Sequence, residues 1–396
     1  MTMKTCCGLL AVVIITGGLS SGCGRGEAAA VLTKPVVPPA LTAAAPRQAL
    51  VAFDKAFYVG NPRQGSYVDS ARTGPADFWK EAEMIETVED YHSLTRDPAY
   101  ERLALALCRG VIGRYGSNWL YLPSVTGHGR IGQRANDDVM WMVIAFARAA
   151  AMSGDKTYLD AAAQNFDGVY ARAWSTALGG GLWWRTAGDR PGKNTTTNAP
   201  AVIAAVELFK ATGESRYRAA AEAIYTWLRA NLYDPRSGRV FDSVVPNGAG
   251  AVSVNRVQFT YNQGSFIGAA ALLYGVTREK PFYGDALHAL SYTQAHLTQG
   301  GILQNDSTQA DQDSGGFKGI FARWALTFTR DNSISRFDSW FRLNADTAWS
   351  ERNSGGVVGW DWRAKTGTGR LYSWDCSSAV AMMEALLPVS TQAVRR

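Results

Sequence analysis

One recurring phrase constrains the fold of this chain more than any other feature. An apolar stretch ends in Thr or Ser, an acidic residue follows two positions later, and an aromatic residue comes three positions after the acid. A hydroxyl residue that ends one helix, with an acid that favours the start of the next, indicates a tight break between paired helices. The phrase recurs at fixed order as Thr95-Arg96-Asp97 with Tyr100, Ser153-Gly154-Asp155 with Tyr158, Thr212-Gly213-Glu214 with Tyr217, and Thr277-Arg278-Glu279 with Phe282.

The apolar periodicity agrees with a chain of helices. After Asp138, the apolar residues Val139, Met142, Val143 and Phe146 fall at i, i+3, i+4 and i+7, which is one face of a helix. Read in this way, the chain is expected to form helices at 47–59, 76–94, 98–114, 136–152, 156–172, 198–212, 215–231, 261–277, 281–298, 315–330, 334–350 and 374–387.

The connections between these helices alternate in length. Even-numbered helices are followed by breaks of about three residues, and odd-numbered helices by about 16 to 29 residues rich in Gly, Trp, Asn and Asp. Long loops in a compact domain usually carry function, and in an up-down array they all lie on one face. We therefore expect an all-α, single-domain (α/α)6 toroid of six helix pairs. An open solenoid of the same pairs is the alternative, because the sequence does not show closure.

The first residues predict export. Lys4 precedes an apolar run, and small residues lead to Ser21-Gly22-Cys23, which is similar to a bacterial lipoprotein signal except that Ser20 stands where that pattern prefers Leu. We expect a signal peptide at 1–22, lipidation of Cys23, an Ala/Pro-rich tether at 23–46 and the folded domain at 47–390. The expected location is secreted and membrane-anchored, in the periplasm or at the cell surface, with plain secretion as the alternative.

Composition excludes several other classes of protein. The net charge of +6 comes from 40 basic and 34 acidic residues, and no Lys/Arg block indicates nucleic-acid binding. Four His and the absence of a Cys/His ligand spacing argue against a metal site, and no cofactor is expected. Cys108 and Cys376, the two Cys of the folded domain, either pair or stay as buried thiols. We expect a monomer.

Polar phrases stand where the inner helices of such a ring begin. Asn, Asp, Ser and Thr are the preferred helix caps, so each phrase alone is explained by capping. One residue suffices for a cap, however, and five phrases on one rim also suggest a site. They are 136–138, 193–198, 261–264, 313–319 and 373–375.

The adjacent acids Asp137 and Asp138 exceed what capping requires. A helix start favours an ionised Asp, whereas two like charges this close disfavour double ionisation and separate the two pKa values. One ionised and one protonated carboxyl is the arrangement that glycoside hydrolysis uses, and a separation of about 5 Å corresponds to retention. Aromatic residues of the long loops could provide flat surfaces for sugar rings, or could simply fix the loops; they are Trp119, Tyr121, Trp183, Trp184, Trp360 and Trp362.

The stretch 136–141, Asn-Asp-Asp-Val-Met-Trp, resembles the catalytic Asp-Asp motif of glycoside hydrolase family 76, the endo-α-1,6-mannanases. Asn136 departs from the aromatic or aliphatic residue expected before the pair. Further similar segments cover about residues 50–390, and in order they are Phe78-Trp79, Glu83-Met84, Asp90-Tyr91, 181–184, Lys193-Asn194, 198–200, 238–242, 261–264 and 317–324.

The resemblance implies an (α/α)6 toroid, no metal, and retaining hydrolysis of α-1,6-mannosidic bonds in a polysaccharide or oligosaccharide. It makes Asp137 the nucleophile and Asp138 the acid/base. The candidate substrate-binding residues are Asn136, Trp183, Trp184, Asn194, Asp242, Asn262, Gln263 and Trp360. Two alternatives remain, a transglycosylase on the same glycans and a non-catalytic glycan-binding lipoprotein. A sugar epimerase is disfavoured because only His128 lies in a predicted loop.

Overall fold

The computed structural model describes residues 44–71, 74–123, 130–186, 192–247 and 252–387. The chain divides into a unit of residues 1–37 and a unit of residues 38–396, and the first unit is outside the described residues. The predicted signal peptide, Cys23, most of the tether and His128 also lie outside them. Among the helices that are described, none is long and apolar enough to cross a membrane.

Twelve α-helices are present in the described residues, and all twelve predicted helices are confirmed in order. They are α1 (Ala45–Phe57), α2 (Phe78–Thr95), α3 (Pro98–Tyr115), α4 (Asn136–Ser153), α5 (Lys156–Ala173), α6 (Thr195–Thr212), α7 (Ser215–Leu232), α8 (Thr260–Thr277), α9 (Lys280–His296), α10 (Phe317–Asp331), α11 (Asp338–Ser350) and α12 (Ser373–Met383). Helix α1 begins two residues earlier than predicted, because Pro46 takes a first-turn position where its missing N–H costs nothing. Helix α6 begins three residues earlier, because Asn194 caps it by accepting from Thr197 N at 3.1 Å.

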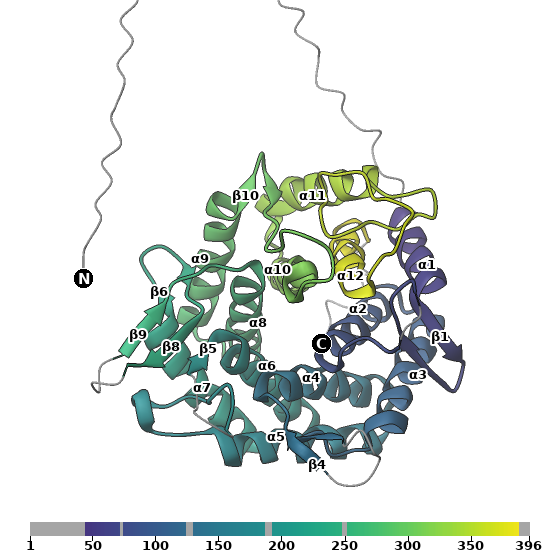
Figure 1. Ribbon diagram of the computed structural model, residues 1–396. Helices are drawn as coiled ribbons and strands as arrows, with labels where there is room; N and C mark the ends of the chain where they lie inside the picture. Colours follow the sequence, from purple (N-terminus) through teal and green to yellow (C-terminus); the bar gives the residue numbers. More distant parts are fainter. Residues whose placement is uncertain (1–43, 72–73, 124–129, 187–191, 248–251, 388–396) are drawn as a thin grey trace, which may run out of the picture. The chain divides into compact units, whose positions relative to one another are not determined.

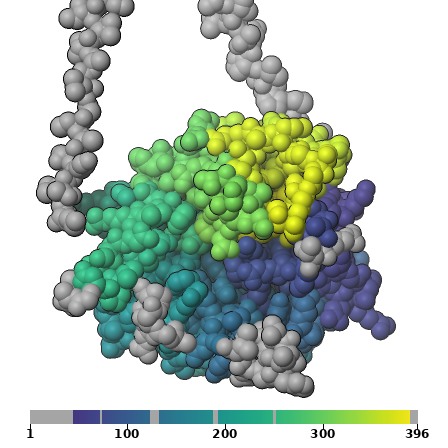
Figure 2. Space-filling model, in the orientation of Figure 1, coloured from purple at the N-terminus to yellow at the C-terminus, as the bar shows by residue number. Residues whose placement is uncertain are grey.

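The inner helices close a ring. Each of α2, α4, α6, α8, α10 and α12 packs against the next, and α12 packs against α2. Helices α1, α3, α5, α7, α9 and α11 surround them (Figure 1). In Figure 2 the yellow C-terminal helices adjoin the purple N-terminal ones. The (α/α)6 toroid is confirmed, and the open solenoid is not, because the first and last inner helices are in contact.

The recurring phrase forms the tight breaks between paired helices. In the first copy the Thr95 hydroxyl donates to Tyr91 O at 2.6 Å and accepts from Asp97 N at 3.2 Å. The intervening Arg96 has φ 59°, which turns the chain sharply between α2 and α3. The same pair of hydroxyl hydrogen bonds occurs at Ser153, Thr212 and Thr277. Local chemistry therefore explains why four inner helices are followed so closely by their outer partners.

The long connections carry short antiparallel strands and some of the single turns of 3-10 helix at the end of the ring where the inner helices begin. The strands are β1 (Tyr58–Asn61), β2 (Gln64–Tyr67), β3 (Tyr121–Pro123), β4 (Arg130–Gln133), β5 (Lys193–Asn194), β6 (Tyr233–Asp234), β7 (Arg239–Val240), β8 (Ser243–Pro246), β9 (Val252–Asn255), β10 (Thr298–Gln299) and β11 (Ile302–Leu303). The largest sheet has the order β5-β8-β9, and the others are two-stranded. The 3-10 turns at that end are η1 (Ala177–Gly179) and η2 (Asp313–Gly316), whereas η3 (Ser335–Phe337) and η4 (Glu384–Leu386) follow the ends of the inner helices α10 and α12.

A buried charge cluster lies deeper between α2, α4 and α10. We use this name for four acids of α2 and two arginines: Glu83, Glu86, Glu89, Asp90, Arg148 and Arg323. Arg323 Nε is 2.8 Å from Asp90 Oδ2, and Arg148 Nη1 is 3.2 Å from Glu86 Oε2. Arg323 is only 2% exposed. The cluster joins inner helices that are more than 230 residues apart in the chain.

Candidate active site

The two predicted acids lie at the start of α4 and face a cavity of about 630 Å³. The N-cap residue of the helix is Ala135, which provides no side-chain cap. The cavity is bounded by the starts of α2, α4, α6, α8 and α10. Its lining residues include Asp77, Trp79, Asp137, Asp138, Trp141, Trp184, Arg185, Asn194, Thr196, Asp242, Phe259, Tyr261, Asp313 and Phe317.

The Asp137 carboxyl is surrounded by hydrogen-bond donors. Asp137 Oδ1 accepts from the Trp184 Nε1–H at 3.1 Å and from the Asp138 backbone N–H at 3.1 Å. Thr196 Oγ1 lies 3.5 Å from the other oxygen, Oδ2. Burial raises the pKa of Asp137, and the backbone and indole hydrogen bonds and the Arg185 charge oppose that rise.

The Asp138 carboxyl has a different environment. Burial raises its pKa well above the usual range, and the negative charge of Asp137 raises it further. Asp77 and Asp313 act in the same direction, whereas the Arg134 guanidinium opposes them. Because donors favour the ionised form of Asp137 and neighbouring acids disfavour that of Asp138, the protonated form is favoured more strongly at Asp138 than at Asp137.

Aromatic rings on the inner-helix starts form the walls of the cavity. The rings of Tyr261 and Phe317 are stacked, with centroids 3.6 Å apart and planes inclined by 14°. Trp79 packs edge-on against Trp374 at 4.8 Å. Flat apolar faces beside carboxylates and hydroxyls suit a sugar ring, which has apolar faces and polar edges. Of the long-loop rings for which a sugar surface and a loop-fixing role were both open, Trp184 lines the cavity, whereas Trp119 and Trp362 are fully buried and fix the loops.

Five of the ten predicted site residues line the cavity: Asp137, Asp138, Trp184, Asn194 and Asp242. Asp242 Oδ2 accepts from Asn255 Nδ2 and from Ser243 Oγ, both at 3.0 Å. Asn194 also caps α6, so capping explains the polar stretch 193–198. By contrast, α4, α8, α10 and α12 have no side-chain cap.

The other five predicted residues lie outside the cavity lining. Asn136, Asn262 and Gln263 are fully buried, and Trp183 is 6% exposed. The Gln263 amide binds the backbone of Val240 and Ala289, and Asn262 Nδ2 donates to Asp242 Oδ1 at 3.2 Å. Trp360 lines a separate hollow beside Tyr372. The side-chain amides of Asn136, Asn262 and Gln263 stabilise the wall from behind, which a one-dimensional motif does not reveal.

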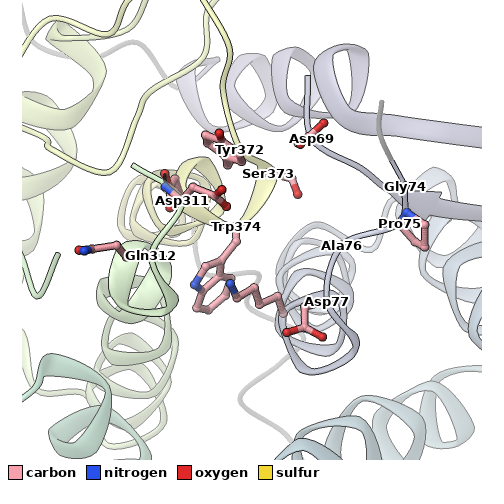
Figure 3. A pocket seen from close by; sticks show the side chains of 12 residues that line it. Asp69, Gly74, Pro75, Ala76, Asp77, Asp311, Gln312, Tyr372, Ser373 and Trp374 are labelled. Atoms are coloured by element: carbon pink, nitrogen blue, oxygen red, sulfur yellow. Dashed lines mark hydrogen bonds between the residues drawn. The ribbon is translucent and has the colours of Figure 1, made fainter. Parts of the chain in front are cut away.

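A second hollow, of about 240 Å³, adjoins the cavity and shares Asp77 with it. It lies between the starts of α2 and α12 and the segment before η2, as Figure 3 shows. Tyr372, Trp374 and Gln312 contribute to its lining, and Lys80 is 2.9 Å from Asp313 at its edge. Asp77, which the hollow and the cavity share, is one of the acids that raise the pKa of Asp138.

Sequence reasoning missed two charged residues that act on the pair. Asp77 has the pattern of a helix cap, and it does cap α2 by accepting from Phe78 N at 2.9 Å. Arg134 precedes α4 without any motif. No signal in one sequence distinguishes either from an ordinary surface charge.

No group of three or more His, Cys, Asp or Glu among the described residues could hold a metal ion. Cys108 and Cys376 are both buried free thiols. Burial raises the pKa of each thiol well above its usual value, so neither is set up as a nucleophile.

A closed ring of six inner and six outer helices with a carboxyl pair at its mouth defines a glycoside hydrolase of the α/α-toroid class. The family model described as glycosyl hydrolase family 76 matches residues 42–395, and the chain belongs to this family.

Curated relatives and solved structures agree with the family. The chain is 26% identical to mannan endo-1,6-alpha-mannosidase DFG5 of Saccharomyces cerevisiae, over 84% of this chain and 75% of the relative. It is 27% identical to mannan endo-1,6-alpha-mannosidase DCW1 of Candida glabrata, over 88% and 79%. The structure of an alpha-1,6-mannanase from Salegentibacter sp. HEL1_6 is similar with a TM-score of 0.76 at 28% identity, covering 87% of this chain and 98% of that one. A variant of that mannanase with two Asp replaced by Asn is described as inactive and was solved with alpha-1,6-mannotriose.

Proposed function

We propose that this chain is a retaining glycoside hydrolase that cleaves α-1,6-mannosidic bonds in mannan-type polysaccharide or oligosaccharide. The observation that carries the proposal is the pair of carboxyls with unequal proton affinity, Asp137 and Asp138, at the floor of an aromatic-walled cavity. The substrate class is supported by the names of the relatives and by the mannotriose bound to the Salegentibacter enzyme.

The two acids divide the reaction into two displacements. The ionised Asp137 attacks the anomeric carbon while protonated Asp138 donates its proton to the glycosidic oxygen, which leaves as an alcohol. A mannosyl ester on Asp137 remains. Asp138, now ionised, removes a proton from water, the resulting hydroxide attacks the same carbon, and the Asp137 carboxylate is released. Two displacements at one carbon retain its configuration.

The position of Asp138 also orients the substrate. The acid that protonates the glycosidic oxygen must face the leaving sugar, so the leaving part of the chain passes on the Asp138 side. The second hollow, with Tyr372 and Trp374, adjoins the cavity through Asp77 and is the proposed place of that part of the chain. The sugar that becomes attached to Asp137 then lies towards Trp184, Thr196 and Asp242.

The experiment that tests the proposal is incubation of the purified protein with linear α-1,6-mannan, with the first products followed by proton NMR. We expect new reducing ends that appear first as the α-anomer and then mutarotate. First appearance of the β-anomer would exclude retention. Absence of any cleavage after prolonged incubation, with oligosaccharide still bound, would favour the glycan-binding alternative instead.

The same intermediate also permits transglycosylation, in which a sugar hydroxyl replaces water. Added mannose oligosaccharide acceptors separate the two reactions, because a transglycosylase produces longer chains and little free sugar.

We further propose that the protein is secreted and held at a membrane by a lipid on Cys23, with a monomeric catalytic domain. Replacing Cys23 by Ala is expected to move the enzyme from the membrane fraction to the soluble fraction.

A further inference from the structure

Arg172, in the last turn of the outer helix α5, lies behind the active site and is not within salt-bridge distance of any carboxylate in the described part of the chain. Its guanidinium donates hydrogen bonds to three uncharged oxygen atoms. Nε donates to Asn136 Oδ1 at 2.8 Å, Nη1 to Leu120 O at 2.7 Å, and Nη2 to Arg134 O at 2.9 Å. Burial lowers the pKa of Arg172 to about 10. A desolvated cation without an acid is costly, which indicates that the geometry it imposes is useful.

One branch of this contact leads to Asp137. Asn136 Nδ2 donates to Trp183 O at 2.7 Å, and the Asn136 backbone N–H donates to Trp184 O at 2.9 Å. Asn136 therefore holds the segment that carries the Trp184 indole, and that indole donates to Asp137 Oδ1. Asn136 is the residue at which this chain departs from the pattern expected before the acid pair.

The other branch leads to Asp138. The carbonyl of Arg134 accepts from Arg172, and the backbone N–H of Arg134 donates at 3.1 Å to Leu120 O, the second carbonyl that Arg172 contacts. The main chain of Arg134 is thus fixed at both ends. Its guanidinium lies 3.9 Å from the centroid of the Phe78 ring and is the positive charge that acts on Asp138.

We propose that Arg172 and Asn136 form a positioning brace, which holds the Trp184 indole on Asp137 and the Arg134 guanidinium beside Asp138, and so keeps in place the two groups that favour the ionised form of each acid. The inference rests on the proposed function, because it assigns a role in the same double displacement. Neither residue of the brace touches the substrate cavity. Both act through the groups that contact the acids, which are the Trp184 indole for Asp137 and the Arg134 guanidinium for Asp138.

The expected sign follows from the charges that face each acid. Asp137 faces Asp138 and Arg185, and Asp138 faces Asp137, Arg134, Asp77 and Asp313. Loss of the brace withdraws the indole donor from Asp137 and the arginine from Asp138. Both losses disfavour an ionised carboxylate, so the pKa values of both acids rise. The acidic and basic limbs of the activity profile then move together to higher pH.

The test compares Arg172→Met, Arg172→Lys and Asn136→Ala with Arg229→Met. Arg229 also lies in the last turn of an outer helix, α7, but its guanidinium binds Asp285 on α9, away from the cavity. We expect Arg172→Met and Asn136→Ala to lower kcat about 10- to 100-fold and to move both limbs up by about 0.5 to 1 pH unit. KM changes little, and Arg172→Lys restores part of kcat. Arg229→Met lowers the thermal unfolding temperature without moving either limb.

A second readout does not need turnover. Carbon-13 NMR of Asp-labelled protein, with Asp137→Asn and Asp138→Asn for assignment, titrates both carboxyls directly in wild type, Arg172→Lys and Asn136→Ala. Unchanged titration curves and pH limbs in the folded variants, with only a loss of thermal stability, would overturn the brace. Shifted carboxyl titrations in a protein whose wild type cleaves no α-1,6-mannan would support the brace and contradict the proposed function.

Discussion

Two groups of neighbouring acids in this toroid contain carboxyls with raised pKa values, Asp137 and Asp138 in one and Glu83, Glu86 and Glu89 in the other, but the two groups differ in their access to substrate. Asp137 and Asp138 stand at the start of α4 and open into the cavity. The acids of the buried charge cluster lie inside the ring, and their partner Arg148 is about 15 Å further along the same helix. The first pair is reachable by substrate and is met by few fixed cations. The three glutamates of the second group are enclosed, and two arginines occupy its centre.

The comparison shows that a perturbed pKa alone does not identify chemistry. Burial is the largest cause of the raised pKa of Asp138 at the mouth and of Glu89 in the cluster. What differs is access, because a proton on Asp138 can be delivered to a ligand and a proton on Glu89 cannot. We expect substitutions at the mouth to affect turnover, and substitutions in the cluster to affect folding.

The largest expected effect is on turnover. Asp137→Asn removes the nucleophile and Asp138→Asn the acid/base, and each is expected to lower kcat by at least about 10³-fold. The unfolding temperature should stay the same or rise, because one of two neighbouring buried acids is neutralised. Initial rates on α-1,6-mannan and thermal unfolding together test this. Near-normal hydrolysis by both variants would contradict the catalytic role of the two acids.

The next effect belongs to the buried charge cluster. Arg323→Met leaves Glu83, Glu86 and Asp90 without their central cation, and the expected loss is about 3–5 kcal/mol of unfolding free energy. Denaturant titration by circular dichroism measures it. Arg342→Met on the exposed face of α11 is the control. A stable Arg323→Met protein with low activity would mean that the cluster serves catalysis rather than folding.

A smaller effect is expected from substitution of Trp184, which contacts Asp137 in the cavity. Trp184→Phe keeps an aromatic ring but removes the N–H that favours ionised Asp137, so the pKa of Asp137 rises. We expect kcat to fall about 10-fold and the acidic limb of kcat/KM to move up by about one pH unit. Trp362→Phe is the matched control, since the buried Trp362 indole N–H has no hydrogen-bond partner among the described residues. An identical shift in both variants would contradict the assignment.

The smallest effect concerns pH and stability. The pKa of Glu89 is raised well above 4.5, first by burial, so its contribution to stability is complete below that pH and is lost as pH rises through the raised value. The unfolding free energy should therefore decline from about pH 5 towards alkaline pH, and Glu89→Gln should flatten the decline. Urea titrations at several pH values measure the slope. The partly exposed Glu222→Gln should leave it unchanged, and an equal effect of both would remove the distinction between enclosed and partly exposed acids.

Much of the fold could be predicted because its determinants are local. Helix periodicity and the hydroxyl–acid break depend on residues within one or two turns, and all twelve helices follow from them. The acid pair was also visible, since two adjacent Asp at a helix start are unusual without a function. The sequence did not show which of the remaining polar residues line the cavity and which support its wall. Asn262 and Asp242 both look like sugar ligands in sequence, but one faces the wall and the other faces the cavity.

By itself, the sequence determined the pairing of helices, the order of the ring and the place of Asp137 and Asp138 at a helix start. Only the tertiary structure decided that the ring closes, that Arg134 and Trp184 reach different acids, and that Arg172 supports both. The physical reason is distance along the chain. Helix propensity and capping are set by neighbours in sequence, whereas burial and electrostatic fields are summed over residues that only folding brings together.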